Sequence, residues 1–205
     1  MAGALAWTGR WDDARTVAET IANPFWRAGA LRAVAGALAQ ARRWDDARAV
    51  AATIADPEER AEALREVAGA LVQAGRWDDA RAVAATIADP KERAEALREV
   101  AGALAQAGDT QAAQATFAAA RAVAETIANP FWRAVALRVL AQALIRAGQI
   151  DDAMALLVSA WAQAQTVNEL TTLFVVDSSL LRTYPTLGGD LLAAFGWVEQ
   201  VVRAG

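Results

Sequence analysis

Apolar residues recur at every third or fourth position through most of the chain, the spacing that places them on one face of an α-helix. In the stretch from Asp56 to Ala88 this spacing occurs twice, first from Ala63 to Leu71 and again from Val83 to Ile87. No segment alternates apolar and polar residues in the manner of a half-buried strand. The pattern therefore predicts an all-α protein.

The residues between the apolar stretches predict where each helix begins and ends. Asp56 is expected to cap the first helix, with Pro57 at its first position and Glu59 completing a pair of the capping-box kind. Gly75 is expected to end that helix in a left-handed conformation. The second helix begins near Trp77 with acidic residues in its first turn, and the next Asp-Pro ends it. The unit is a helical hairpin, which cannot bury both of its faces alone.

This hairpin is repeated along the chain. Tryptophans recur at intervals of 33 residues, at Trp11, Trp44 and Trp77. Prolines recur at intervals of 33, 33 and 40 residues, at Pro24, Pro57, Pro90 and Pro130. Residues 44–76 and 77–109 agree at all but three positions, so these hairpins are expected to be structurally equivalent. The longer interval predicts a second helix that is extended by seven residues, near 110–128.

The repeat fades after about residue 165, which divides the chain into a helical-repeat domain, 1–165, and a capping domain, 166–205. Thr166 and Glu169 form a capping-box pattern before an apolar run, and Thr186 starts another, so two capping helices are predicted. At the other end, residues 2–5 match the middle of a hairpin. We therefore expect the chain to be cut from a longer protein.

The hairpin resembles a tetratricopeptide repeat. The residues at the large, small and turn positions of that family are Leu64, Val67, Ala68, Leu71, Gly75, Trp77 and Ala80. The chain departs from the family in its period, one residue short of the usual 34, and in Arg42, which stands where other turns have glycine. The resemblance implies a right-handed superhelical solenoid in which the first helix of each hairpin lines the concave face.

A narrower resemblance covers nearly the whole chain. The Trp-Asp-Asp-Ala and Asn-Pro-Phe-Trp-Arg-Ala units, with the tail segments 181–187 and 193–197, look like the C-terminal sensor arms of bacterial STAND signalling ATPases. This resemblance implies an ATPase and an effector module upstream in the intact protein. The chain itself contains no Gly-rich phosphate-binding loop ending in Lys-Ser or Lys-Thr.

Composition excludes most catalytic chemistry. The chain has no cysteine and no histidine, and Lys91 is its only lysine. These absences remove thiolate nucleophiles, the usual zinc sites and the commonest general base. The chain is therefore predicted not to be an enzyme and to use neither a cofactor nor a metal.

Charge and hydropathy narrow the class of partner. The net charge is −4, and the basic residues are spread at regular intervals, which argues against nucleic acid and against an anionic membrane. No apolar run approaches the roughly 20 residues that span a bilayer, and the N-terminus lacks the features of a signal peptide. A protein or peptide partner and a cytoplasmic location are the resulting expectations.

Four arginines share one position of the first helices and are the candidate partner-binding residues: Arg32, Arg65, Arg98 and Arg138. On the concave face such a row would grip carboxylates through bidentate hydrogen bonds. Alternatively, glutamates of the same helices neutralise the row, as at Arg65 and Arg98. Arg32 and Arg138 have no glutamate at these offsets, so they are predicted to be the arginines that contact a partner.

Aromatic pairs occupy the starts of two first helices, at Phe25 and Trp26 and again at Phe131 and Trp132. They are either exposed anchors for an interface or residues that pack on a neighbouring hairpin. The paired aspartates of the Trp-Asp-Asp-Ala units are assigned to capping and to the helix dipole, because adjacent residues on a helix do not face one another.

Glycines also stand inside predicted helices, at Gly3, Gly36, Gly69 and Gly102. Each costs about 1 kcal/mol relative to alanine. They serve either close packing of helices or the approach of a ligand's backbone.

Together these features predict a protein-interaction or scaffold module, the sensing arm of a larger bacterial signalling protein, which binds a protein or peptide on its concave face. The alternative is a structural or self-assembly module with no separate ligand, in which near-identical hairpins stack or the long helix near 110–128 dimerises into a homo-oligomer.

Overall fold

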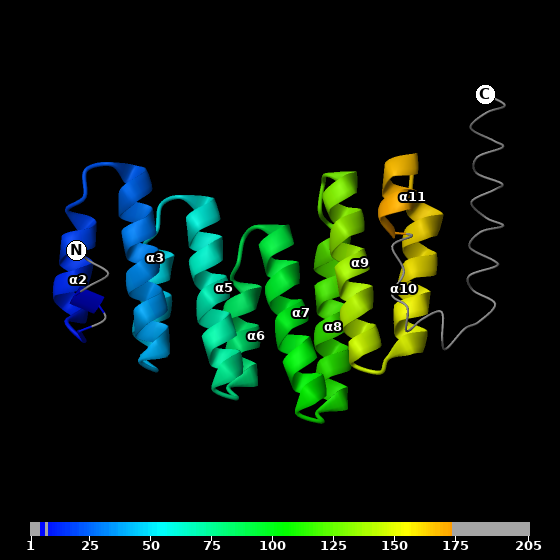
Figure 1. Cartoon of the computed structure of the whole chain (residues 1–205), viewed down its shortest axis with the longest axis horizontal. Helices are drawn as coiled ribbons and strands as arrows, with labels where there is room; N and C mark the ends of the chain where they lie inside the picture. The colour runs from blue at the N-terminus through cyan, green and yellow to red at the C-terminus, as the bar shows by residue number, and fades with distance from the viewer. Residues whose placement is uncertain (1–4, 7, 174–205) are drawn as a thin grey trace. The chain divides into compact units, whose positions relative to one another are not determined.

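The computed structural model describes residues 5, 6 and 8–173, and every regular element in them is a helix (Figure 1). The chain divides into two compact units, one up to Ile127 and one from Ala128. The prediction of an all-α array of helical hairpins is confirmed. The right-handed superhelix and the domain boundary at residues 165 and 166 stay predictions.

Long and short helices alternate in the first unit. The first helices of its hairpins are α3 (Pro24–Gln40), α5 (Pro57–Gln73) and α7 (Pro90–Gln106), each of 17 residues. The second helices are α2 (Trp11–Glu19), α4 (Trp44–Ala52) and α6 (Trp77–Ala85), each of 9 residues, and α8 (Thr110–Glu125), of 16 residues. The extension of the last second helix by seven residues is therefore confirmed.

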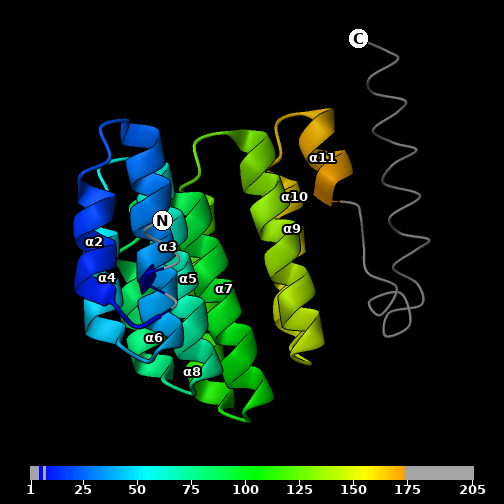
Figure 2. The same ribbon diagram turned by 60° about the vertical axis from the view of Figure 1, so that its left-hand side comes forward.

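The helices of the first unit form two layers. Helices α3, α5 and α7 lie side by side in one layer, and α4, α6 and α8 pack against them in the other (Figures 1 and 2). The core between the layers contains Leu64, Val67 and Leu71 of α5, together with Val83 and Ile87, all of them buried. Each hairpin thus buries its apolar stripe against its neighbours, as a repeat array requires.

The second unit contains α9 (Pro130–Arg146), α10 (Ile150–Gln163) and α11 (Val167–Leu173), and α9 contacts both of the others. Thr166 begins α11 as predicted: its Oγ accepts a hydrogen bond from the Glu169 backbone N–H at 3.2 Å and donates one to Glu169 Oε1 at 2.8 Å. A helix that follows Thr166 is confirmed as far as Leu173, and its predicted continuation to Leu181 lies outside the described residues. The second capping helix, from Thr186, and the tail segments 181–187 and 193–197 lie outside the described residues.

The N-terminal caps of the first helices follow the sequence pattern. The Asp56 carboxylate accepts a hydrogen bond from the Glu59 backbone N–H at 2.9 Å, and Asp89, Asn23 and Asn129 cap their helices in the same way. The Glu59 carboxylate, however, lies 3.1 Å from Nη1 of Arg32 in the preceding hairpin. Of the predicted capping pair, only the hydrogen bond from the Glu59 backbone N–H to Asp56 is present. The Glu59 side chain instead contacts Arg32 of the preceding hairpin.

An arginine at one position of the repeat holds the junctions before α3 and α5, a role that sequence reasoning missed. Arg60, three residues after Pro57, donates a hydrogen bond from Nη1 to the Ile54 carbonyl at 3.1 Å, and Arg27 donates to the Ile21 carbonyl at 3.3 Å. These carbonyls follow the ends of second helices, where backbone acceptors lack partners within the helix. The recurrence of arginine three residues after each of the four repeat prolines was the available signal.

The turns inside the hairpins share one conformation, whether or not they contain glycine. Gly75 has φ 72°, and the Arg76 N–H returns to the Leu71 carbonyl at 2.9 Å. Arg42 has φ 61°, with the equivalent bond from Arg43 N–H to the Leu38 carbonyl at 2.9 Å. Arg42 is the only residue other than glycine at positive φ in the described part of the chain, so it holds the left-handed turn as predicted.

Replacing Arg42 by glycine is expected to raise the free energy of unfolding by about 1 kcal/mol, because a Cβ atom is disfavoured in the left-handed region. The measurement is urea denaturation followed by circular dichroism. Gly75→Arg is the reciprocal control and is expected to cost a similar amount. An Arg42→Gly protein no more stable than the wild type would contradict the expectation.

Candidate protein-binding site

The exposed face of the first helices carries the arginine row, and its first two members are neutralised by glutamates of the following helix. Arg32 Nη1 lies 3.1 Å from Glu59 Oε2 and makes an ion pair with Glu62, while Arg32 Nε lies 3.9 Å from Glu66 Oε1. The prediction that Arg32 has no neutralising partner is therefore wrong. The carboxylates belong to α5. The prediction considered only residues close to Arg32 within α3, so it could not detect them.

Arg65 repeats this arrangement one hairpin later. Its Nε lies 3.1 Å from Glu92 Oε2, and its Nη1 lies 3.9 Å from carboxylate oxygens of Glu95 and Glu99 on α7. The prediction that Arg65 is neutralised is confirmed, but by the next helix. Each arginine thus pairs with glutamates 27, 30 and 34 residues further along the chain.

Arg98 does not continue this series. Its guanidinium lies 3.6 Å from Glu99 of its own helix, and its Nε is buried with no hydrogen-bond partner among the described residues. The positions of α9 that correspond to Glu92, Glu95 and Glu99 hold Trp132, Val135 and Val139. Glu99 is the ion-pair partner of Arg98 among the described residues.

Arg138, in the second unit, has no ion-pair partner within the described residues, and its Nε is buried without a hydrogen bond. Its side chain is partly exposed. The prediction that Arg138 is not neutralised agrees with this geometry. Within the described residues, the arginines of the row that have no ion pair with a glutamate of another helix are therefore Arg98 and Arg138, each in its own unit.

Burial also changes the pKa of two glutamates that pair with the arginine row. The pKa values of Glu66 and Glu99 are raised, mainly because burial disfavours the charged carboxylate, against the opposing attraction of Arg32 on Glu66 and of Arg98 on Glu99. A raised carboxyl pKa gives a contribution to stability that is complete below the unfolded-state pKa and is lost as the pH rises through the folded-state value. At neutral pH these two glutamates therefore keep some cost of desolvation.

The glycines of this face differ in what surrounds them. A Cβ atom at Gly36 would lie 3.1 Å from Glu66 Oε2, whereas one at Gly69 or Gly102 would meet nothing within 4 Å. Close packing of helices is therefore the wrong explanation at Gly69 and Gly102. Gly3 lies outside the described residues. These two glycines leave the surface of α5 and α7 open in the middle of each helix.

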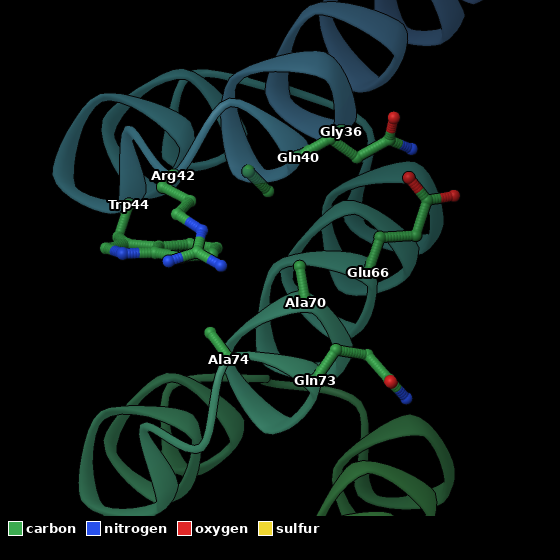
Figure 3. A pocket seen from close by; sticks show the side chains of 9 residues that line it. Gly36, Gln40, Arg42, Trp44, Glu66, Ala70, Gln73 and Ala74 are labelled. Atoms are coloured by element: carbon green, nitrogen blue, oxygen red, sulfur yellow. The ribbon is translucent and has the colours of Figure 1, made fainter.

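A pocket of about 660 Å³ lies on this face between α3 and α5 (Figure 3). Arg42 and Trp44, at the turn after α3, lie on one side of it, and Glu66 and Gln73 of α5 line the other. Gly36, Gln40 and three alanines complete its lining.

The aromatic pairs are exposed. Phe25 and Trp26 are 65% and 66% exposed, and Phe131 and Trp132 are 38% and 47% exposed. In both pairs the rings meet edge to face with centroids 5.1 Å apart. Of the two alternatives for these residues, the structure favours exposed anchors, most clearly at Phe25 and Trp26.

The paired aspartates form local ion pairs at the starts of the second helices. Asp79 accepts a hydrogen bond from Arg76 Nε at 2.7 Å, and Asp46 accepts the equivalent bond from Arg43. No group of histidine, cysteine, aspartate or glutamate side chains suited to a metal ion occurs within the described residues. None of the described helices is both long and apolar enough to cross a lipid bilayer.

Fold and surface together define an all-α protein of stacked helical hairpins. No protein-family model matches the chain, and no curated protein has a detectably similar sequence. Among solved structures, the chain is similar to that of Ton1535 from Thermococcus onnurineus NA1, with 24% identity and a TM-score of 0.45 over 66% of this chain. The match spans 42% of the length of the Ton1535 chain.

Proposed function

We propose that the chain is a protein-interaction module that binds an acidic segment of a protein or peptide on the exposed face of its first helices. The observation that carries the proposal is the end of the ion-pair series: Arg98 and Arg138 lack the cross-helix glutamates that neutralise Arg32 and Arg65. A guanidinium that no glutamate of another helix neutralises pairs strongly with an incoming carboxylate. Each of the two arginines is proposed as a separate contact.

The broader context of the proposal rests on the sequence resemblances. Tetratricopeptide-like hairpins commonly serve as binding surfaces, and the Asn-Pro-Phe-Trp-Arg-Ala units resemble the sensor arms of STAND signalling ATPases. We therefore propose a non-enzymatic, cytoplasmic sensing arm of a larger bacterial signalling protein. The open surface at Gly69 and Gly102 supports the proposal, because a ligand's backbone can approach the helices there.

Alanine substitutions of the row test the proposal once a partner has been captured. Arg98→Ala and Arg138→Ala are each expected to weaken binding by about tenfold or more, because truncating an interface arginine typically removes about 2 kcal/mol at a hot spot. Arg65→Ala is the matched control and is expected to change the affinity little, since Glu92 already occupies its guanidinium. The measurement is isothermal titration calorimetry at two salt concentrations.

Equal affinities for the three variants would refute the arginine contacts. Thermal unfolding of each variant, followed by circular dichroism, separates lost binding from lost folding. Reduced binding by Arg65→Ala alone would also contradict the proposal.

Self-assembly is the second candidate function, and the exposed Phe25 and Trp26 rings are the observation that favours it. Light scattering over a range of concentrations distinguishes the two candidates. A stable homo-oligomer that fails to capture any partner supports assembly, whereas a monomer that binds a partner through Arg98 or Arg138 supports the interaction module.

A further inference from the structure

The exposed aromatic pairs belong to a longer duplicated segment. Residues 15–32 and 121–138 are identical except at two positions, where Thr16 and Gly29 correspond to Ala122 and Val135. Both copies contain an ion pair at 2.8 Å in the second helix, Arg15 with Glu19 and Arg121 with Glu125. The duplication therefore preserves the sequence and this local ion pair beside each aromatic pair.

The repeat fold does not require these aromatic residues. The hairpins that begin at Pro57 and Pro90 carry Glu58 with Glu59 and Lys91 with Glu92 at the same positions, and their first helices have the same length of 17 residues. Large rings that are two-thirds exposed present apolar surface to water without contributing to the core. A docking function accounts for their presence at the start of α3.

An acidic pocket adjoins this aromatic pair. It has a volume of about 770 Å³ and lies between the starts of α3 and α5, with Phe25 as one wall. Its charged lining consists of the carboxylates of Glu19, Asp56 and Glu59 and the guanidinium of Arg27. Glu19 is paired with Arg15 and Glu59 with Arg32. Asp56 has no ion pair among the described residues and accepts a hydrogen bond from the Glu59 backbone N–H, so its carboxylate is the one left in the pocket for a cation.

We infer that the Phe25 and Trp26 surface with its acidic pocket binds a partner segment that carries a lysine or arginine beside an apolar residue. The aromatic faces attract a cation through their quadrupoles and cover its apolar stem. The Asp56 carboxylate attracts the cationic head. The site differs from the Arg98 and Arg138 contacts in both place and charge, so it stands independently of the proposed function.

The second copy offers a weaker version of the same site. Helix α11 begins with Thr166 at the position that Asp56 holds in α5, and its Glu169 is buried and 3.8 Å from Arg133. One carboxylate is therefore missing and another is withdrawn from solvent. The pair at Phe131 and Trp132 is accordingly expected to contribute less to the binding of a cation.

A random heptapeptide display library tests the inference, because it offers the protein segments with and without a cation beside an apolar residue. The library is selected on the wild-type chain and, in parallel, on a Phe25→Ala/Trp26→Ala variant, which keeps its helical circular dichroism because both rings are exposed. Sequences with lysine or arginine beside an apolar residue are expected to be enriched on the wild type alone. The recovered peptide is expected to bind the double variant at least about tenfold more weakly.

Two neutralising variants then test the charge. Asp56→Asn keeps the helix cap, since asparagine caps α3 and α9, and is expected to weaken the peptide about threefold or more at low salt. Asp89→Asn, the same change one hairpin later, is expected to leave the affinity unchanged. Recovery of acidic or uncharged sequences, recovery of none, or an equal loss with Asp89→Asn would each overturn the inference. Aromatic-dependent binding to lipid vesicles, or self-association in place of peptide binding, would overturn it as well.

Discussion

Leu71→Ala is expected to lower the free energy of unfolding of the first unit by about 3 kcal/mol. Leu71 is 2% exposed and lies in α5, which contacts α3, α6 and α7, so its loss leaves a cavity at the centre of the array. Leucine-to-alanine changes at such positions typically cost about 2 to 5 kcal/mol. The cost combines the lost burial of the removed methyl and methylene groups with the cavity that they leave. The measurement is urea denaturation followed by circular dichroism.

Leu104 supplies the matched variant, because it is also 2% exposed and holds the same position in α7. Leu104→Ala is expected to cost the same within about 1 kcal/mol if neighbouring hairpins are energetically equivalent. Val158→Ala, at a side chain that is 53% exposed, is the control and is expected to cost less than about 0.5 kcal/mol. A Leu71→Ala loss below that of the control would show that the layers do not pack as described.

Trp77→Ala is expected to cost about 2 kcal/mol, below the roughly 3 to 5 kcal/mol typical of a fully buried tryptophan. The ring is half-buried, and its Cζ2 lies 3.8 Å from the position of a Cβ atom on Gly75, so it packs over the turn that precedes α6. Trp44 occupies the same position in α4, with the guanidinium of Arg76 5.9 Å from its ring centroid. The residue that corresponds to Arg76 in the next hairpin is Asp109.

Trp44→Ala is therefore expected to cost more than Trp77→Ala, by about 0.5 to 1 kcal/mol, because it also removes a cation–π contact between hairpins. Trp26→Ala, at a ring that is 66% exposed, is the control and is expected to leave the unfolding free energy almost unchanged. Equal losses for Trp44 and Trp77 would show that the Arg76 contact contributes nothing to stability. Losses under about 1 kcal/mol for both would show that these rings are available for binding.

The sequence alone determined the local structure of this protein. The helix starts at Asp56 and Thr166, the left-handed turn at Arg42 and the added length of α8 were all predicted, and the structure contains each of them. Caps and turns depend on residues three to six positions apart, so a short stretch of sequence contains all the residues that form them. Because the sequence repeats every 33 residues, a local prediction that is correct for one hairpin also applies to the equivalent positions of the others.

Only the tertiary structure decided which side chains of the candidate surface are neutralised and which are exposed. The glutamates that pair with Arg32 lie 27, 30 and 34 residues away, a relation that arises because α3 and α5 pack side by side. Offsets within one helix therefore made Arg32 look unpaired and made Arg98 look as well neutralised as Arg65. Exposure of Phe25 and the empty space beside Gly69 likewise depend on where neighbouring helices end, because burial is a property of the packed array.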